Sequence, residues 1–178
     1  DTAHLVVGDS GWQLPIPVIK TSAGWQFDIK EGAEEILTRE IGRNELAAIE
    51  ALHAYVDAQQ SYFAMNQKYA QKIVSSKGKK DGLYWPASPG EAPSPLGPAF
   101  SPKEPGTGYH GYRFRILPDN HGFAMVAWPV SYGQTGVMSF VINQDDKVYQ
   151  SDLGSDSEQK ARALAAYNPD KTWQPAAP

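Results

Sequence analysis

The chain has 178 residues, with 16 Lys or Arg, 20 Asp or Glu, no cysteine and a formal net charge of −4. The absence of cysteine excludes disulfides, thiol catalysis, zinc fingers and iron–sulfur clusters. A sequence-independent grip on nucleic acid needs a surplus of basic charge that this chain lacks, and no run approaches the roughly 18 apolar residues of a membrane span. We therefore expect a single domain over residues 1–178, no nucleic-acid partner and no membrane-spanning segment.

Residues 1–30 predict an N-terminal arm followed by a hairpin. Two extended runs, residues 14–20 and 25–29, flank a Thr-Ser-Ala-Gly segment whose length and composition are typical of a hairpin connection. Pro15 and Pro17 cannot donate hydrogen bonds to a neighbouring strand. The first run is therefore expected at the edge of its sheet.

Residues 31–76 predict a helical region. Three glutamates gather at its start, where negative charge favours the exposed amides of a first turn, and Gly42 is expected to interrupt it. Asn44 can cap a second, longer helix whose apolar positions recur every three to four residues and which should end near Asn66. A weaker helical turn is expected at 69–74.

A change of character follows at residues 86–108, which hold seven of the 14 prolines. No regular element is expected there. A connection of this length inside a compact domain is usually a functional loop or a poorly ordered arm. Aromatic residues stand immediately before and after this Pro/Gly-rich loop, and they could anchor it.

Residues 109–151 predict an antiparallel meander. The pattern over 112–116 alternates between apolar and charged side chains, 123–128 is apolar on both faces, and shorter strands are expected at 138–142 and 148–150. Tight connections between successive strands favour antiparallel pairing.

Ser155 or Ser157 is expected to cap a C-terminal helix over 155–168, which Asn168 and Pro169 would stop. The predicted fold class is therefore α+β: a long N-terminal amphipathic helix packed on a four-stranded antiparallel meander, with an N-terminal hairpin and a C-terminal helix added.

Several segments carry a resemblance that spans nearly the whole chain. They are Gly-Arg-Asn-Glu-Leu-Ala-Ala-Ile at 42–49, Tyr-Val-Asp-Ala-Gln at 55–59, Asp-Gly-Leu-Tyr-Trp-Pro at 81–86, Gly-Tyr-His-Gly-Tyr-Arg-Phe at 108–114, Ala-Trp-Pro-Val at 127–130 and Thr-Gly-Val-Met-Ser-Phe at 135–140. The chain resembles an uncharacterised family of exported bacterial proteins, domain of unknown function 2950. The resemblance implies a periplasmic or extracellular location with the signal peptide removed, and a second secreted or envelope protein as partner. It implies no activity.

A looser resemblance is to the head domains of type IV pilins and pseudopilins. It rests on Asn-Glu at 44–45, Ala-Gln-Gln-Ser-Tyr at 58–62, Gly-Tyr-Arg-Phe at 111–114, Trp-Pro-Val at 128–130, the 135–140 segment and Val-Tyr at 148–149. Pilin subunits polymerise through a hydrophobic N-terminal helix, whereas residues 30–42 are rich in charge and a hairpin precedes them. The resemblance therefore implies a pilin-like head without pilus assembly by the usual route.

Two segments match the sequence of known functional motifs, but the residues around them do not fit the structure that each motif needs. Residues 106–111 spell the Gly-x-Gly-x-x-Gly dinucleotide fingerprint, but a proline-rich loop precedes it and a strand follows, where the motif needs a strand and then a helix. Residues 8–11 copy the Gly-Asp-Ser-Gly segment of trypsin-like proteases, but only nine residues precede Ser10.

The four histidines share no metal spacing, and His53 is expected to contact Asp57 along the helix. We expect no cofactor and no metal site.

The candidate residues for binding a partner or ligand are aromatic or lie beside aromatics. Rings next to a long loop can hold a sugar, a peptide or a partner's loop, although in a chain with few aliphatic residues they are first of all core. The candidates are Tyr84, Trp85, Tyr109, His110 and Tyr112.

The function expected from these observations is that of a non-enzymatic exported envelope protein of pilin-like fold, acting by protein–protein contact. One alternative is a hydrolase with its site near the 86–108 loop and His110 as base, which requires that histidine in a concave pocket with an orienting carboxylate. Another is a carbohydrate- or peptide-binding module, which requires Trp85 and at least one tyrosine to be exposed on one surface. No catalytic residue is assigned.

Overall fold

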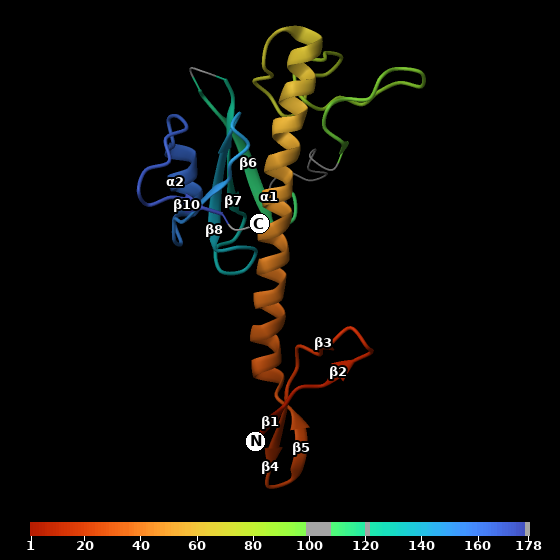
Figure 1. Cartoon of the computed structure of the whole chain (residues 1–178), viewed down its shortest axis with the longest axis vertical. Helices are drawn as coiled ribbons and strands as arrows, with labels where there is room; N and C mark the ends of the chain where they lie inside the picture. The colour runs from red at the N-terminus through yellow and green to blue at the C-terminus, as the bar shows by residue number, and fades with distance from the viewer. Residues whose placement is uncertain (99–107, 120–121, 177–178) are drawn as a thin grey trace. The chain divides into compact units, whose positions relative to one another are not determined.

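The computed structural model describes residues 1–98, 108–119 and 122–176. The chain is mixed α+β, with one long helix and antiparallel sheets (Figure 1). It divides into two compact units, Asp1–Arg43 (unit 1) and Asn44–Pro178 (unit 2), and each is described by itself. The expectation of one domain over residues 1–178 stays a prediction.

Unit 1 contains five short strands and the beginning of helix α1 (Ile29–Asn66). Three of the strands form an antiparallel sheet in the order β1-β4-β5, and the other two pair with each other. The predicted hairpin is present as β4 and β5. The strands are β1 (Thr2–Ala3), β2 (Val6–Val7), β3 (Trp12–Gln13), β4 (Val18–Thr21) and β5 (Gly24–Phe27).

The predicted position of the first hairpin strand at a sheet edge is wrong. Strand β4 lies between β1 and β5, and it begins at Val18, after both Pro15 and Pro17. Both prolines precede the paired residues of β4, and the carbonyl of Pro17 still accepts from the amide of Asp28. They therefore do not confine the strand to an edge.

Helix α1 is continuous from Ile29 to Asn66, so the predicted interruption at Gly42 is wrong. Asp28 caps its start, because its Oδ1 accepts a hydrogen bond of 3.1 Å from the amide of Glu31. A glycine inside a helix costs only about 1 kcal/mol relative to alanine, which is too little to end a helix of good helix formers. The predicted end near Asn66 is confirmed.

Contacts inside unit 1 hold the first turns of α1 against the strands. Gly32 is buried against Ile16, and a Cβ atom on this glycine would lie 2.9 Å from both branches of the isoleucine side chain. Arg39 donates a hydrogen bond of 2.8 Å to the carbonyl of Gln13 in β3. A side chain larger than hydrogen at position 32 would separate the helix from residue 16.

Unit 2 contains a sheet of five antiparallel strands, so the predicted four-stranded meander is corrected to five. The additional strand β10 pairs with β9 after the chain has passed through helix α2 (Ser157–Ala163). A two-residue strand that contains a proline has no periodic signal in the sequence. The sheet order is β10 (Gln174–Pro175), β9 (Tyr149–Asp152), β8 (Met138–Asn143), β7 (Ala124–Pro129) and β6 (Tyr112–Leu117).

Two further expectations for unit 2 are wrong. Helix α2 is shorter than the predicted 155–168, and its N-cap residue is Asp156 where a serine was expected. Residues 69–74 form no helical turn; Val74 instead makes a bridge with Tyr84.

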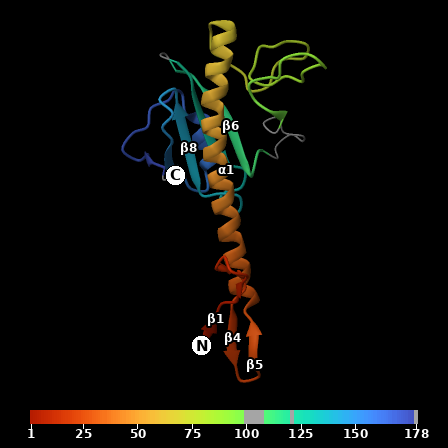
Figure 2. The same cartoon turned by 45° about the vertical axis from the view of Figure 1, so that its right-hand side comes forward.

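The sheet of unit 2 is covered on both faces, as Figures 1 and 2 show. One face packs against the part of α1 that follows Asn44, and the buried residues there include Leu52, Tyr55 and Phe140. The other face packs against α2 through a second cluster that includes Trp128 and Ala161. Strand β7 is buried along its whole length because it is central and covered on both sides.

Polar contacts fix α1 to the start of β8. The side-chain amide of Asn44 donates to the carbonyl of Thr135 at 3.0 Å, and Glu45 Oε1 accepts from the amides of Val137 and Met138 at 2.9 and 3.0 Å. The Asn-Glu and Thr-Gly-Val-Met segments, far apart in the chain, therefore bind each other. Because the groups at 135–138 belong to the backbone, these contacts explain the side chains of Asn44 and Glu45.

Gly136 lies against the ring of Tyr112 so closely that no Cβ atom fits there. The Tyr112 hydroxyl donates to the carbonyl of Met138 at 2.8 Å, and its ring is fully buried. Burial, with the nearby Glu45 carboxylate, raises the pKa of this hydroxyl above its usual range. Tyr112 is therefore a neutral structural side chain.

A buried polar network lies under the C-terminal half of α1. Gln59 is fully buried, and its side-chain amide both donates to the carbonyl of Ala70 and accepts from its amide, each at 2.9 Å. The same amide group donates to the hydroxyl of Tyr55, which donates to the carbonyl of Ala124 in β7. This network fixes the chain after α1 and joins the helix to the sheet.

Candidate functional site

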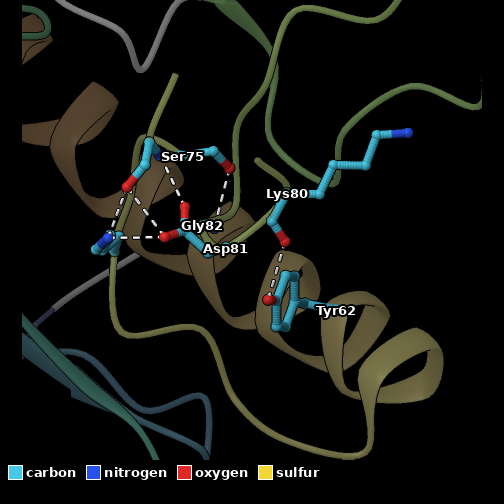
Figure 3. Close-up of polar contacts among 7 residues, drawn as sticks. Tyr62, Ser75, Lys80, Asp81 and Gly82 are labelled. Carbon is cyan, nitrogen blue, oxygen red and sulfur yellow. Dashed lines mark hydrogen bonds and ion pairs between the residues drawn. The ribbon is translucent and has the colours of Figure 1, made fainter. Parts of the chain in front are cut away.

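The segment that leads to Tyr84 and Trp85 is a folded loop held by one carboxylate (Figure 3). Asp81 accepts hydrogen bonds from the Lys72 ammonium at 2.8 Å and from the amide and hydroxyl of Ser76 at 2.7 and 3.0 Å. The Lys72 hydrogen bond and the Ser76 amide hold the pKa of this carboxyl well below its usual range. The charged form of Asp81 therefore organises the loop.

Trp85 is part of the core of unit 2. Its side chain is 7% exposed, and the Lys80 ammonium lies 5.6 Å from the centre of its ring. Tyr84 is half-buried and packs against the same core. The carbohydrate-binding alternative required an exposed Trp85, and this condition is not met.

Residues 109–112 form a tight turn that explains the failed dinucleotide motif. The amide and carbonyl of Tyr109 both pair with those of Tyr112, at 2.8 and 2.9 Å, and the two central residues have φ of 46° at His110 and 71° at Gly111. Positive φ at both central positions is the mark of a type I′ hairpin turn. Residues 106 and 107 of the motif, like 99–107 of the predicted loop, lie outside the described residues.

His110 sits at the tip of this turn. The side chain is exposed, and its ring meets the Tyr109 ring edge-on with 4.4 Å between centroids. Within residues 1–98, 108–119 and 122–176, no carboxylate is hydrogen-bonded to His110, and this residue lines neither of the two cavities described below. The condition set for the hydrolase alternative is therefore not met by the described residues.

An open cavity of about 460 Å³ lies at strand β6 in unit 2. Two of the five candidate residues, Tyr109 and Tyr112, line it; the other three do not. Side chains alternate along β6, so the cavity has an apolar half on the α1 face and a cationic half on the α2 face. We call it the β6 cavity.

The cationic half of the β6 cavity is built around α2. Glu158 pairs with Arg162 at 3.0 Å and with Arg113 at 2.7 Å, and these two arginines lower the pKa of its carboxyl, Arg162 having the larger effect. Arg115 donates from Nη2 to the carbonyls of Ala161 and Leu164, both at 2.8 Å. Ala161 lies in the last turn of α2 and Leu164 is its C-cap residue, so Arg115 satisfies carbonyls that a helix end leaves unpaired.

A smaller cavity of about 390 Å³ includes His53, whose Nδ1 lies 2.6 Å from Asp146 Oδ1. The expected contact between His53 and Asp57 is replaced by this long-range pair. Asp146 has a φ of 56° and follows Asn143, which ends β8. Both side chains of the pair are about half exposed, at 45% and 53%, so solvent weakens it.

Unit 1 carries a different candidate surface, made of exposed apolar side chains. Within residues 1–43, all of which the structure describes, only Pro17 and Gly32 are buried. The large apolar side chains exposed there are Leu5, Val6, Val7, Trp12, Trp25, Phe27, Ile29 and Ile36.

Strand β5 is an edge of its sheet, with Trp25 56% and Phe27 50% exposed. The amide of Asp28 donates to the carbonyl of Pro17 at 2.8 Å, so residues 17 and 28 form a hydrogen-bonded pair of the β4–β5 ladder. Such pairs alternate with non-bonded ones, and Trp25 and Phe27 occupy the non-bonded positions. Their N–H and C=O groups therefore face away from β4, along the open side of the sheet.

The five candidate residues did not include two residues that line the cavity, Arg115 and Trp128. They lie on neighbouring strands, since Trp128 pairs in register with Arg113, two positions before Arg115. The alternation of arginines with apolar residues along 112–116 was the signal for this face in the sequence.

Within the described residues, no three His, Asp or Glu side chains gather in a way that could hold a metal ion. None of the helices in that part of the chain combines the length and apolar character needed to cross a bilayer.

A comparison with protein families matches residues 1–176 to the family described as "Protein of unknown function (DUF2950)". Neither the curated proteins nor the solved structures contain a match to this chain.

Proposed function

The chain belongs to the DUF2950 family of proteins of unknown function, and from this premise we propose that it is a non-enzymatic, exported protein of the bacterial envelope. It acts by binding another secreted or envelope protein. The observation that carries this proposal is the open edge of β5 in unit 1, with its two exposed aromatic side chains.

An open strand edge is a template for another strand. The N–H and C=O groups of Trp25 and Phe27 face away from β4, and both side chains lie on one face of the sheet. An extended segment of a partner can pair with these backbone groups, while its side chains pack on the two rings. Unpaired edges of this kind are commonly protected by charge or proline, and β5 itself carries neither.

The negative charge of unit 1 indicates that the partner segment carries basic residues. Residues 1–43 contain seven acidic and four basic side chains. A partner segment with apolar side chains at alternate positions matches the exposed rings of this surface. Basic residues beside them match its negative charge. A second copy of this chain brings the same acidic charge and is disfavoured as the occupant.

The pilin-like fold and the location are parts of the same proposal. Support for a pilin-like head comes from the packing of α1 on an antiparallel sheet and from the contacts of Asn44 and Glu45 with residues 135–138. The fifth strand, β10, departs from the pattern of the resemblance. A periplasmic or extracellular location, with the signal peptide removed, is what the resemblance to exported bacterial proteins implies.

The experiment is site-specific photo-crosslinking in the native host. A photoreactive amino acid replaces Trp25 in the intact chain, and in a matched control it replaces Met65, which is 56% exposed on α1. The expected result is one discrete adduct with another envelope protein from position 25 and none from position 65. The same adducts from both positions, or an adduct with a second copy of the chain, would contradict the proposal.

A set of substitutions at Phe27 tests strand pairing itself. Phe27→Pro removes the outward N–H, Phe27→Ala removes only the ring, and Phe27→Leu keeps both an apolar side chain and the N–H. Loss of the position-25 adduct should be greatest for Phe27→Pro and least for Phe27→Leu. Equal loss in the proline and alanine variants would mean that the ring binds and the backbone does not.

A further inference from the structure

We propose that the β6 cavity of unit 2 binds a small monocarboxylate with an aliphatic tail. This inference does not depend on the proposed function, since it concerns another surface and another class of ligand. It rests on three observations: two buried donors without acceptors among the described residues, the guanidinium charge of Arg115, and an apolar half that continues from them.

The first observation concerns Trp128 and Arg115, which both line the cavity. Trp128 is 2% exposed, and its indole N–H has no hydrogen-bond partner among the described residues; the same holds for the buried Nε of Arg115. A buried donor without an acceptor costs about 1–3 kcal/mol, and such groups are rare in native proteins. The two donors indicate that an acceptor belongs in the cavity.

Strand register makes Trp128 and Arg115 neighbours on the same face of the sheet. Trp128 in β7 is opposite Arg113 in β6, so Arg115 is its diagonal neighbour on the α2 face of the sheet. A carboxylate has two oxygens that only accept hydrogen bonds, and it can accept from both donors at once. A hydroxyl or an amide would add a hydrogen-bond donor of its own to a site that already contains two unpaired donors.

The second observation is the local charge. Three guanidinium groups, those of Arg113, Arg115 and Arg162, line the cavity, and one described carboxylate, Glu158, pairs with two of them. Arg115 donates instead to two neutral backbone carbonyls. Its positive charge therefore favours an anion over a neutral ligand.

The third observation is the apolar half of the same cavity. Ile73, Leu96, Phe114 and Met125 line it, and all four belong to the core cluster on the α1 face or pack against it. The volume of about 460 Å³ falls in the range of about 300–1,000 Å³ that is typical of small-molecule sites. A carboxylate at Trp128 and Arg115 would direct an aliphatic tail around β6 into this half.

The test is calorimetric titration of the intact chain with dodecanoate. Trp128→Phe removes the indole N–H and keeps an aromatic ring. The matched control is Trp85→Phe, because Trp85 is also buried with an unpartnered N–H but does not line the cavity. We expect saturable one-to-one binding, weakened about tenfold or more in Trp128→Phe and unchanged in Trp85→Phe.

Three other probes test the chemistry of the ligand. Acetate, which lacks the tail, and dodecan-1-ol, which lacks the charge, should each bind at least about tenfold more weakly than dodecanoate. An acetylated tripeptide that ends in leucine carries the same carboxylate on a peptide, and we expect it to bind more weakly than dodecanoate.

Four results would overturn the proposal. They are the absence of saturable dodecanoate binding, equal affinities in the two tryptophan variants, tighter binding of the alcohol than of the carboxylate, and tighter binding of the tripeptide. Since Trp128→Phe could also loosen the core, its thermal unfolding is compared with that of Trp85→Phe. If Trp128→Phe is unfolded, Arg115→Lys, which removes Nε and keeps the charge, takes its place with the same expectation.

Discussion

The two units of this chain use the same kinds of apolar residue in opposite ways. In unit 1, Trp25 and Phe27 are 56% and 50% exposed, whereas in unit 2 Trp128 and Phe140 are 2% and 0% exposed. All four side chains lie on strands of antiparallel sheets. The difference comes from what covers each sheet: unit 2 has helices on both faces of long strands, and unit 1 has strands of two to four residues with almost nothing buried.

This comparison teaches that an apolar side chain on a strand is not by itself evidence of a core. Burying a large aromatic side chain stabilises a fold by about 1.5–3 kcal/mol, and unit 1 leaves that gain unused in the described chain. An isolated two-stranded sheet such as β2–β3 is at best marginally stable in water. The exposed rings of unit 1 therefore contribute little to folding in the described chain.

The largest expected effect on stability distinguishes a buried aromatic residue of unit 2 from an exposed one of unit 1. Phe140→Ala should reduce the free energy of unfolding by about 3–5 kcal/mol, because it leaves a cavity in a fully buried site. Phe27→Ala should change it by no more than about 0.5 kcal/mol, because an exposed ring loses little. Urea denaturation followed by circular dichroism measures both. Similar losses in the two variants would remove the distinction between the units.

Alanine substitutions at two glycines should change the stability by a smaller amount. Gly136→Ala should destabilise the protein by about 1–3 kcal/mol, since its methyl group would collide with the fully buried ring of Tyr112. Gly42→Ala meets nothing within 4 Å and lies inside α1, so it should stabilise the protein by about 0.5–1 kcal/mol. Thermal unfolding of both variants checks the signs. A stabilising Gly136→Ala would mean that β8 is not held against Tyr112 as described.

The smallest effect is a dependence on pH in the loop at Asp81. Its folded-state pKa is lowered by Lys72 and Ser76, so its stabilising contribution is complete above the unfolded-state pKa of about 4 and is lost as the pH falls toward the folded-state value. Asp81→Asn lacks this contribution at every pH. The stability difference between the wild type and Asp81→Asn should therefore be largest near neutral pH and shrink in acid.

The control for this prediction is Asp57→Asn, at an exposed position on α1. Urea denaturation at about pH 7 and about pH 2.5 should give a smaller pH-dependent difference for this variant than for Asp81→Asn. A difference for Asp81→Asn that stayed constant or grew in acid would mean that its carboxylate does not hold the loop in its charged form.

The strong local patterns predicted most of the elements. The two-residue alternation along 112–116 corresponds to β6. The middle of the three-to-four-residue repeat after Asn44 lies on the buried face of α1, whereas its end members Leu46 and Phe63 are exposed. Elements that depend on distant partners were missed. Strand β10 exists because it pairs with β9, and α2 ends where Arg115 of β6 meets its last carbonyls.

The candidate residues were predicted less well, because burial depends on tertiary packing. Tyr109 and Tyr112 line the β6 cavity, but Trp85 is core and His110 forms the tip of a turn. A His-Gly pair can supply the positive φ values of a hairpin turn much as Asn-Gly does, and this signal was present in the sequence. No sequence pattern distinguished the exposed rings of unit 1 from the buried ones of unit 2.

The most direct test is residue-resolved hydrogen exchange of the intact chain, alone and in the complex recovered by crosslinking at position 25. The amides of Trp25 and Phe27 should exchange fast in the free chain and become protected in the complex, while exchange in β7 and β8 stays slow in both. Protection that appears only in unit 2, with Trp25 and Phe27 still exchanging fast, would show that β5 does not receive the partner.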